Sequence, residues 1–574
     1  MSRLKPLSLS IHIFGSIFEE MLPLVSIKGM ACFCELQDID TRDLVSNPPT
    51  SERPRCNVLY ACYTAIDILN NDILLVIFQH YRSDNVISWN AQLGWRKLSQ
   101  VCQRWRHLIY GLSLHLGLQI VCTNGAPLVD TLVHLPPLPL VVDYRYTTAT
   151  IDAQDKLGIF HVLHLRDRLY HVALSIPPSN LRQLLWFMDG PFPVLEYLSL
   201  SPSSEEGLFL LLPKTLMAPN LRHLTLVGIG LSDKLLFLSS TLALVTLTLE
   251  NIRGSSYFPQ HLVARLKSLF RLEELTIDFT VTSPPHPGDE SELLQDMEAP
   301  VTLPLLKRLT FRGISPYLDS FVAQIRAYHL QQLDITLFHL FPYTLPHLSH
   351  FINTTEELML PIAKIIFEND AVSIVLDRGE QQGDETSIFS LEVVCHVFNW
   401  QVDCAAQICS ALGTIFSGVE QLTLDFERQL EPEEWLDGDA RRTIWRSLLQ
   451  PFTGARRLRI LGRAIAWELS HASQSGEGWL DAGLLPSLKE LAVTLNEVHV
   501  DIAFASFIEA RQIAGHPVLL SVLQMSRSPS VEPSIRLPHT PSTEFFTSPL
   551  QSRPSTRASW VQRTIIKPFR KRFR

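Results

Sequence analysis

The chain has 574 residues, of which 46% are hydrophobic, and its formal net charge at pH 7 is −9. This acidic balance argues against a dedicated nucleic-acid or membrane binder, because such proteins usually need a net positive surface to meet phosphate groups. No apolar run approaches the ~20 residues that a membrane-spanning helix needs, so we expect no membrane partner.

The first 63 residues mix short apolar runs with polar linkers. The stretch NPPTSERPR at 47–55 combines prolines and charges that prevent a continuous helix. The amino-terminal apolar run is interrupted by His12 and ends at Glu19 without the small-residue cleavage site of a secretory signal. Residues 1–63 are therefore predicted to be a poorly ordered leader.

The nine cysteines indicate the compartment. They are scattered and none forms a C-x-x-C pair, which suits a reducing environment better than a disulfide framework. We therefore expect a cytoplasmic and/or nuclear protein.

Two stretches between residues 64 and 113 carry apolar residues at three- and four-residue spacing. The first contains Leu69, Ile73, Leu74, Ile77, Phe78 and Tyr81, and the second contains Trp95, Leu98, Val101, Cys102, Trp105, Leu108 and Ile109. This period places each set on one helix face, and such short helices can bury their faces only against one another. The pattern predicts a compact helical unit. Its segment KLSQVCQRWRHLIYG at 97–111 is predicted to be one amphipathic helix, with Arg104, Arg106 and His107 on or near its wet side.

These two stretches resemble the F-box, whose outline is L-P-x-E-L-L-x-x-I-F followed by L-x-x-V-C-x-x-W-x-x-L. The matching residues are Leu69, Asp72, Ile73, Leu74, Ile77 and Phe78 in the first half, and Leu98, Val101, Cys102, Trp105 and Leu108 in the second. The continuation at 116–144 is similar to that of the F-box proteins abundant in mushroom-forming fungi. The resemblance covers most of residues 66–144 and, more loosely, the repeats that follow.

The resemblance implies a substrate receptor of an SCF-type cullin ubiquitin ligase, which binds a Skp-family adaptor and, through it, a cullin, and which performs no chemistry itself. The implied adaptor-binding or F-box core residues are Leu69, Asn70, Ile73, Leu74, Ile77, Phe78, Leu98, Val101, Cys102, Trp105 and Leu108. Asn70 replaces the family proline of the Leu-Pro pair that contacts the adaptor, and the loop at 82–94 is long. Asparagine can still begin a helix as a cap. The alternative is a repeat scaffold that has lost ligase coupling.

From about residue 190 an L-x-x-L-x-L pattern takes over, in nine copies. The copies are LEYLSL from Leu195, LRHLTL from Leu221, LVTLTL from Leu244, LEELTI from Leu272, LKRLTF from Leu306, LQQLDI from Leu330, VEQLTL from Val419, RRLRIL around Leu458 and LKELAV from Leu488. Their spacing allows one short strand and one returning helix or turn per unit, and the units are uneven in length. Between Leu360 and Val419 the pattern is blurred, which indicates a longer insertion.

This pattern predicts an α/β fold: an irregular leucine-rich-repeat-like solenoid over residues 114–524, in which neighbouring units stack into one core. The alternative is a generic α/β domain with leucine-rich strands. Strand alternation points the second and third apolar residues of each copy inward and the residues between them outward. The candidate target-binding face therefore comprises His223, Thr225, Thr246, Thr248, Glu274, Thr276, Arg308 and Thr310, each of which is also compatible with an ordinary solvated strand surface.

Motifs for catalysis are missing from the sequence. It contains no phosphate-binding G-x-x-x-x-G-K-[ST] loop, no G-x-S-x-G elbow and no H-E-x-x-H pair. The spaced pairs His161 with His164, and His347 with His350, lack a nearby third ligand. We expect a protein-binding chain that is not an enzyme and uses neither a cofactor nor a metal.

The last segment, 525–574, differs from the rest in charge and composition. It carries a net charge of +8, whereas residues 1–524 carry −17, and residues 525–560 contain nine Ser, four Thr and six Pro. Such a composition buries too little apolar surface to offset chain entropy, so disorder is expected. The terminal KPFRKRFR is compatible with a nuclear-import address, a contact with an acidic surface, or a solvated tail. Nucleic-acid binding through this tail is a further, less favoured reading, because the body is acidic.

Overall fold

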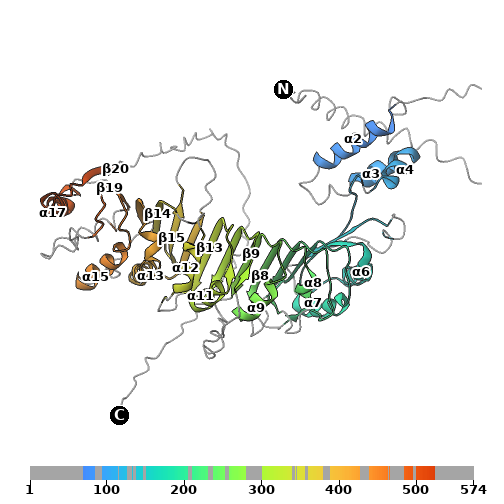
Figure 1. The fold of residues 1–574 in the computed structure, drawn as a ribbon. Coiled ribbons are helices and arrows are strands. Elements are labelled where there is room, and N and C mark those ends of the chain that lie inside the picture. Colours follow the sequence, from blue (N-terminus) through green and yellow to red (C-terminus); the bar gives the residue numbers. More distant parts are fainter. Residues whose placement is uncertain are drawn as a thin grey trace, which may run out of the picture. The chain divides into compact units, whose positions relative to one another are not determined.

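A computed structural model describes residues 69–523 apart from 85–93, 114, 126–131, 133–136, 147–149, 205–209, 231–236, 253–257, 280–299, 339–342, 344, 356–357, 359, 379–387, 427–437, 463–464, 466–483 and 495–499. The predicted leader and basic tail lie outside these residues. The described residues form three short helices and a long, mostly parallel 16-stranded sheet with its connecting helices (Figure 1).

The helical unit predicted from the apolar spacing is present. It consists of α2 (Asn71–Asp84), α3 (Gly94–Val101) and α4 (Gln103–Gly111). The single helix expected over 97–111 is wrong in one respect, because the chain is extended at Cys102, with φ −155° and ψ 168°, and divides it into α3 and α4.

The first part of the sheet is parallel throughout. Its strands are, in spatial order, β1 (Ile120–Thr123), β2 (Leu140–Arg145), β3 (Leu169–Ile176), β4 (Tyr197–Pro202), β6 (His223–Val227), β8 (Thr246–Ile252), β9 (Glu274–Phe279), β11 (Arg308–Gly313) and β13 (Gln332–Phe338). Four two-residue strands form two separate parallel pairs, β5 (Leu210–Leu211) with β7 (Ile229–Gly230) and β10 (Val301–Thr302) with β12 (Ile325–Arg326).

The second part of the sheet begins with an inverted segment, where the chain order runs backward in space. Beside β13 lie β16 (Phe389–Val394), β15 (Ala371–Asp377) and β14 (Ile362–Phe367), with β15 antiparallel to both neighbours. The parallel order then resumes with β17 (Gln421–Phe426), β18 (Arg457–Leu461), β19 (Glu490–Thr494) and β20 (Leu519–Leu523). This inverted segment is the irregularity that the blurred pattern at 360–419 indicated.

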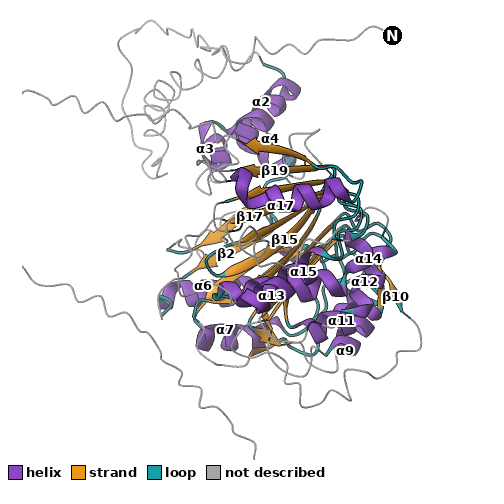
Figure 2. Ribbon diagram, turned by 90° about the vertical axis from the view of Figure 1, so that its left-hand side faces the viewer, coloured by secondary structure: helices purple, strands orange, loops and turns teal. Residues whose placement is uncertain are grey.

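Helices connect the strands. They are α6 (Ala153–His164), α7 (Pro178–Leu185), α8 (Phe237–Ser240), α9 (Pro259–Leu266), α11 (Ser315–Ala323), α12 (Pro346–Asn353), α13 (Phe398–Ala411), α14 (Gly413–Phe416), α15 (Gly438–Leu449) and α17 (Val500–Ile513), with 3-10 turns η3 (Arg166–Arg168) and η4 (Trp186–Met188). Of these, α7, α9, α11, α12 and α13 lie on one side of the sheet (Figure 2).

The core lies between the sheet and these helices. All nine copies of the leucine pattern fall on strands of the one sheet, and their second and third apolar residues are buried, as Leu224 and Leu226 of β6 illustrate. The prediction of one strand per unit is confirmed for these copies, and the arrangement is consistent with a leucine-rich-repeat-like solenoid. The leucine pattern did not reveal β1, β2 and β3, which precede its first copy.

Candidate interaction surfaces

The helical unit is organised around an aromatic contact. The ring of Phe78 on α2 meets Trp105 on α4 edge to face, with 4.9 Å between the centroids. Leu74, Leu98 and Ile109 are buried beside them. Leu74 and Phe78 are four residues apart on α2, and Trp105 and Ile109 are four residues apart on α4, so each pair lies on one helix face. Trp105 is therefore a core residue, as the apolar spacing predicted.

Asn70 begins α2 as a cap. Its side-chain Oδ1 accepts a hydrogen bond of 2.8 Å from the backbone N–H of Ile73, which satisfies one of the free N–H groups at the helix start. Arg104 of α4 adds a second constraint, since it donates to the Asn71 side chain and to the Leu69 carbonyl. The replacement of proline by asparagine thus leaves the start of this helix well defined.

Cys102 does not belong to the apolar stripe in which the sequence pattern placed it. Its side chain is exposed, and its Sγ accepts a bond of 3.5 Å from the backbone N–H of Trp105. Because an extended residue with a side-chain acceptor is what a helix start requires, Cys102 caps α4. Arg106 and His107 are exposed, as predicted, whereas Arg104 is partly buried against α2.

The remaining F-box-like residues separate into buried and exposed sets. Leu69, Ile77, Val101 and Leu108 are partly buried against the core, whereas Ile73 is 47% exposed. Val76, which the sequence pattern missed, is 63% exposed, and its position three residues after Ile73 puts it on the same helix face. Helix α2 therefore presents aliphatic side chains outward as well as inward, and we name the two exposed ones, Ile73 and Val76, the α2 apolar face.

The second surface is the outward face of the sheet. The eight predicted residues fall into two rows of Cα partners across β6, β8, β9 and β11: the first row is His223, Thr246, Glu274 and Arg308, and the second row is Thr225, Thr248, Thr276 and Thr310. His223 and Arg308 are exposed, and the other six are partly exposed. The strand alternation placed them on one face correctly.

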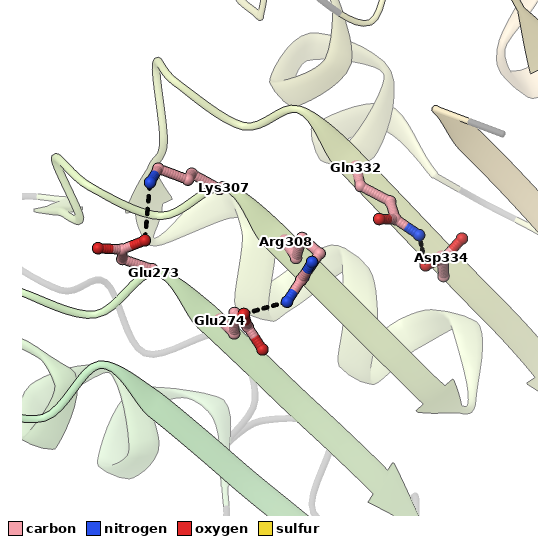
Figure 3. Close-up of polar contacts among 6 residues, drawn as sticks. All are labelled: Glu273, Glu274, Lys307, Arg308, Gln332 and Asp334. Carbon is pink, nitrogen blue, oxygen red and sulfur yellow. Dashed lines mark hydrogen bonds and ion pairs between the residues drawn. The ribbon is translucent and has the colours of Figure 1, made fainter. Parts of the chain in front are cut away.

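Ion pairs join neighbouring strands on this face (Figure 3). Arg308 forms an ion pair with Glu274, and the Lys307 Nζ lies 2.7 Å from the Glu273 Oε2. These two ion pairs link β9 and β11 at their starts. On the next strand, the Gln332 amide donates a bond of 2.8 Å to Asp334. Because these pairs are exposed, each contributes little stability, and they order the surface by holding long side chains in fixed positions.

Two residues that the sequence analysis missed extend the first row toward β3. His171 of β3 stacks on Tyr197 of β4 with 4.0 Å between the ring centroids, and Tyr197 lies 6.0 Å from His223. Burial lowers the pKa of His171, because a partly desolvated imidazole disfavours its charged form. Tyr197 occupies the same place in its leucine pattern as His223, so the repeat contained a signal for it.

Burial also affects carboxyl groups on this face. It raises the pKa of Asp278 on β9 and of Asp334 on β13 above the usual range. For Asp278 the effect is opposed by Arg312, whose guanidinium lies 3.9 Å away. The face therefore combines hydroxyl groups, aromatic rings and partly desolvated carboxylates, which together can donate and accept hydrogen bonds from another protein surface.

A metal site and a membrane-spanning helix are both absent from the described ranges. No group of three His, Cys, Asp or Glu side chains there could hold a metal ion. None of the helices described is both long and apolar enough to cross a membrane. No protein-family model matches this chain, and no curated protein is significantly similar to it.

Proposed function

We propose that this chain is the substrate-recognition subunit of an SCF-type cullin ubiquitin ligase. In this proposal the helical unit binds a Skp-family adaptor through the α2 apolar face, and the outward face of the sheet binds the protein to be ubiquitinated. The chain then acts by holding two partners, and its own residues carry out no covalent step.

The α2 apolar face carries the first half of the proposal. Burying exposed aliphatic side chains contributes roughly 25 cal/mol for each Å² removed from water, and a helical unit of three short helices has no need of such residues for its own core. Contiguous exposed apolar surface is a feature of protein interaction sites, and Ile73 and Val76 lie on one helix face. The position of this face within the F-box-like sequence supports an adaptor as the partner.

The outward face of the sheet supports the second half. Parallel sheets are usually covered on both faces, but here every residue of the polar rows that begin at His223 and Thr225 is exposed or partly exposed. Stacked repeats with one open strand face offer extended surfaces on which a target can contact several units at once. The two rows span four neighbouring strands, which is enough for an extended segment to contact several of them.

The test is direct binding of the purified chain to a purified Skp-family adaptor. A double substitution Ile73→Asp with Val76→Asp places charges on the α2 apolar face without touching the buried Leu74 or Trp105. We expect affinity to fall by at least about tenfold, which corresponds to ~1.4 kcal/mol, because the interface would have to desolvate the new charges. Biolayer interferometry measures the affinity.

Gln100→Asp is the matched control. It adds a charge at an exposed polar position of α3, and circular dichroism would establish that all variants keep their helices. Loss of binding only in the double variant supports the proposal. A folded wild-type chain without measurable adaptor affinity at micromolar concentration would instead favour a repeat scaffold without ligase coupling.

A further inference from the structure

A second exposed apolar cluster lies where α6 meets η4. Leu157 and Phe160 come from α6, and Trp186 and Phe187 come from η4. Trp186 is 80% exposed, Leu157 is 67% exposed and Phe187 is 39% exposed, and the rings of Phe160 and Phe187 meet edge to face at 4.5 Å. We call these four residues the aromatic patch.

The fold itself does not require these side chains. The core-facing stripe of this connection consists of Leu181, Leu184, Leu185 and Met188, all of which are buried. Trp186 and Phe187 lie between members of that stripe and so point away from it. A tryptophan with most of its surface in water is unusual in a packed protein, and large exposed aromatic residues of this kind are enriched at the centres of interfaces.

Two side chains of the patch, Phe160 and Phe187, are held in place before any partner arrives. Arg166 donates a hydrogen bond of 3.2 Å to the backbone carbonyl of Phe187, and the ring of His164 lies 5.6 Å from the Phe187 ring. The ammonium group of Lys156 lies 6.0 Å from the centroid of the Phe160 ring. Anchors that are already ordered lose little conformational entropy on binding, which favours affinity.

Two cations lie beside the patch. Lys156 and Arg166 both contact it, and no ion pair within the described part of the chain includes either residue. Asp167 and Asp189 are near in sequence but form no ion pair with these cations there. A ligand that buries the aromatic rings would therefore approach two cations that lack a carboxylate partner among the described residues, and complementary charge on the ligand would steer and orient it.

We propose that the aromatic patch is a docking surface for an acidic segment of a partner protein. Apolar side chains of that segment pack on Trp186, Leu157 and Phe187, while its carboxylates pair with Lys156 and Arg166. Helices α6 and α7 connect β2 to β3 and β3 to β4. Because α7, which leads directly into η4, lies on the helical side of the sheet (Figure 2), this surface is separate from the outward strand face. The proposal does not depend on the function of the α2 apolar face.

The experiment selects short random peptides displayed on phage against the immobilised full-length chain. A parallel selection uses the Trp186→Ser variant. The peptide most enriched on the wild-type chain is then synthesised, and its affinity is measured by fluorescence anisotropy. We expect enriched peptides to be acidic and to contain apolar residues.

Three variants locate the binding site. Trp186→Ser should weaken binding by roughly tenfold or more, as loss of a central aromatic anchor does, and Lys156→Glu should weaken it by roughly threefold and make it less sensitive to salt. Trp400→Ser is the matched control, because Trp400 on α13 is also exposed, at 53%, and its removal should leave the affinity unchanged.

Four results would overturn the proposal. These are the absence of enrichment, enrichment of neutral or basic peptides, equal affinity for wild type and Trp186→Ser, and a wild-type dimer that Trp186→Ser dissociates in analytical ultracentrifugation. The last result would assign the patch to a second copy of the chain. Circular dichroism of Trp186→Ser excludes misfolding as the cause of lost binding, and the residue's exposure makes misfolding unexpected.

Discussion

The large sheet contains β4, β6, β8, β9, β11 and β13 as well as β14, β15 and β16, but the chain path through these two regions differs. In the first region each strand of the large sheet lies parallel beside the one before it. In the inverted segment the chain passes from β13 over two strand positions to β14, turns back through β15, and places β16 against β13. Helix α13 then leads across to β17.

The outward faces of the two regions differ as well. The first region places threonines in one continuous row, from Thr225 to Thr310. In the inverted segment the equivalent outward positions include apolar side chains, namely Ile362, Ile366, Val375 and Val394. A repeat can be recognised from the sequence when polar outward residues separate the buried leucines and when each strand pairs with the next strand along the chain.

The largest expected effect comes from the core of the regular region. Leu247 of β8 is fully buried between its Cα partners Leu224 and Leu275. Leu247→Ala leaves a cavity, so we expect the free energy of unfolding to fall by about 2 to 5 kcal/mol. Urea denaturation followed by circular dichroism measures the loss.

The distribution of this loss tests whether the two regions are independent. If stability is carried by neighbouring units, hydrogen exchange in Leu247→Ala should speed up in β6, β8 and β9 far more than in β14, β15 and β16. The exposed-face substitution Thr248→Ala is the control and should change stability by no more than about 0.5 kcal/mol. Equal acceleration in both regions would contradict a boundary between them.

A buried hydrogen-bonding side chain links the parts of the inverted segment. Gln401 of α13 is fully buried, and its Nε2 donates to the carbonyls of Glu368 at 2.9 Å and Cys395 at 2.7 Å. It thereby ties the β14–β15 turn to the end of β16. Gln401→Met keeps the volume but leaves two carbonyls without this donor, so a loss of about 1 to 3 kcal/mol is expected.

Hydrogen exchange again provides the measurement. Protection should decrease around residues 368–371 and 394–396, while β6 to β11 stay unchanged. Gln407→Met, on the same helix but only partly buried, removes a single side-chain bond to Asp403 and should have a much smaller effect. If the two substitutions were equivalent, Gln401 would not be the residue that secures the inverted segment.

The sequence allowed prediction where the physical cause was local. Leucine spacing identified nine strands and put eight outward residues on the correct face, because alternation along a strand is fixed by backbone geometry. The path of β14 to β16 was not predictable in this way. A mostly apolar segment such as IAKIIF has the same pattern whether its strand runs parallel or antiparallel to its neighbour. At the helical unit, spacing identified the core around Trp105 but not the break at Cys102, where a capping hydrogen bond replaces a helical turn.

The smallest expected effect lies at the junction of the two regions, on β13. Asp334 faces outward beside Ser390 of β16, and burial raises the pKa of its carboxyl. The folded state therefore keeps this proton to higher pH than the unfolded state does. Asp334 therefore contributes to the free energy of unfolding below the ordinary aspartate pKa, and this contribution is lost as the pH rises through the pKa of Asp334 in the folded state. Asp334→Asn removes this charge while its amide oxygen can still accept the bond from Gln332.

We therefore expect Asp334→Asn to be slightly more stable than the wild type at neutral pH, by about 0.5 kcal/mol or less. The advantage should vanish at about pH 3, below the ordinary aspartate pKa, because both side chains are then neutral. Thermal unfolding at the two pH values measures the difference. A variant that is less stable at neutral pH would mean that groups at the junction stabilise the carboxylate. Charged groups would then stabilise the outward face at the junction, as the ion pairs do between β9 and β11. The two regions would then differ only in the path of the chain.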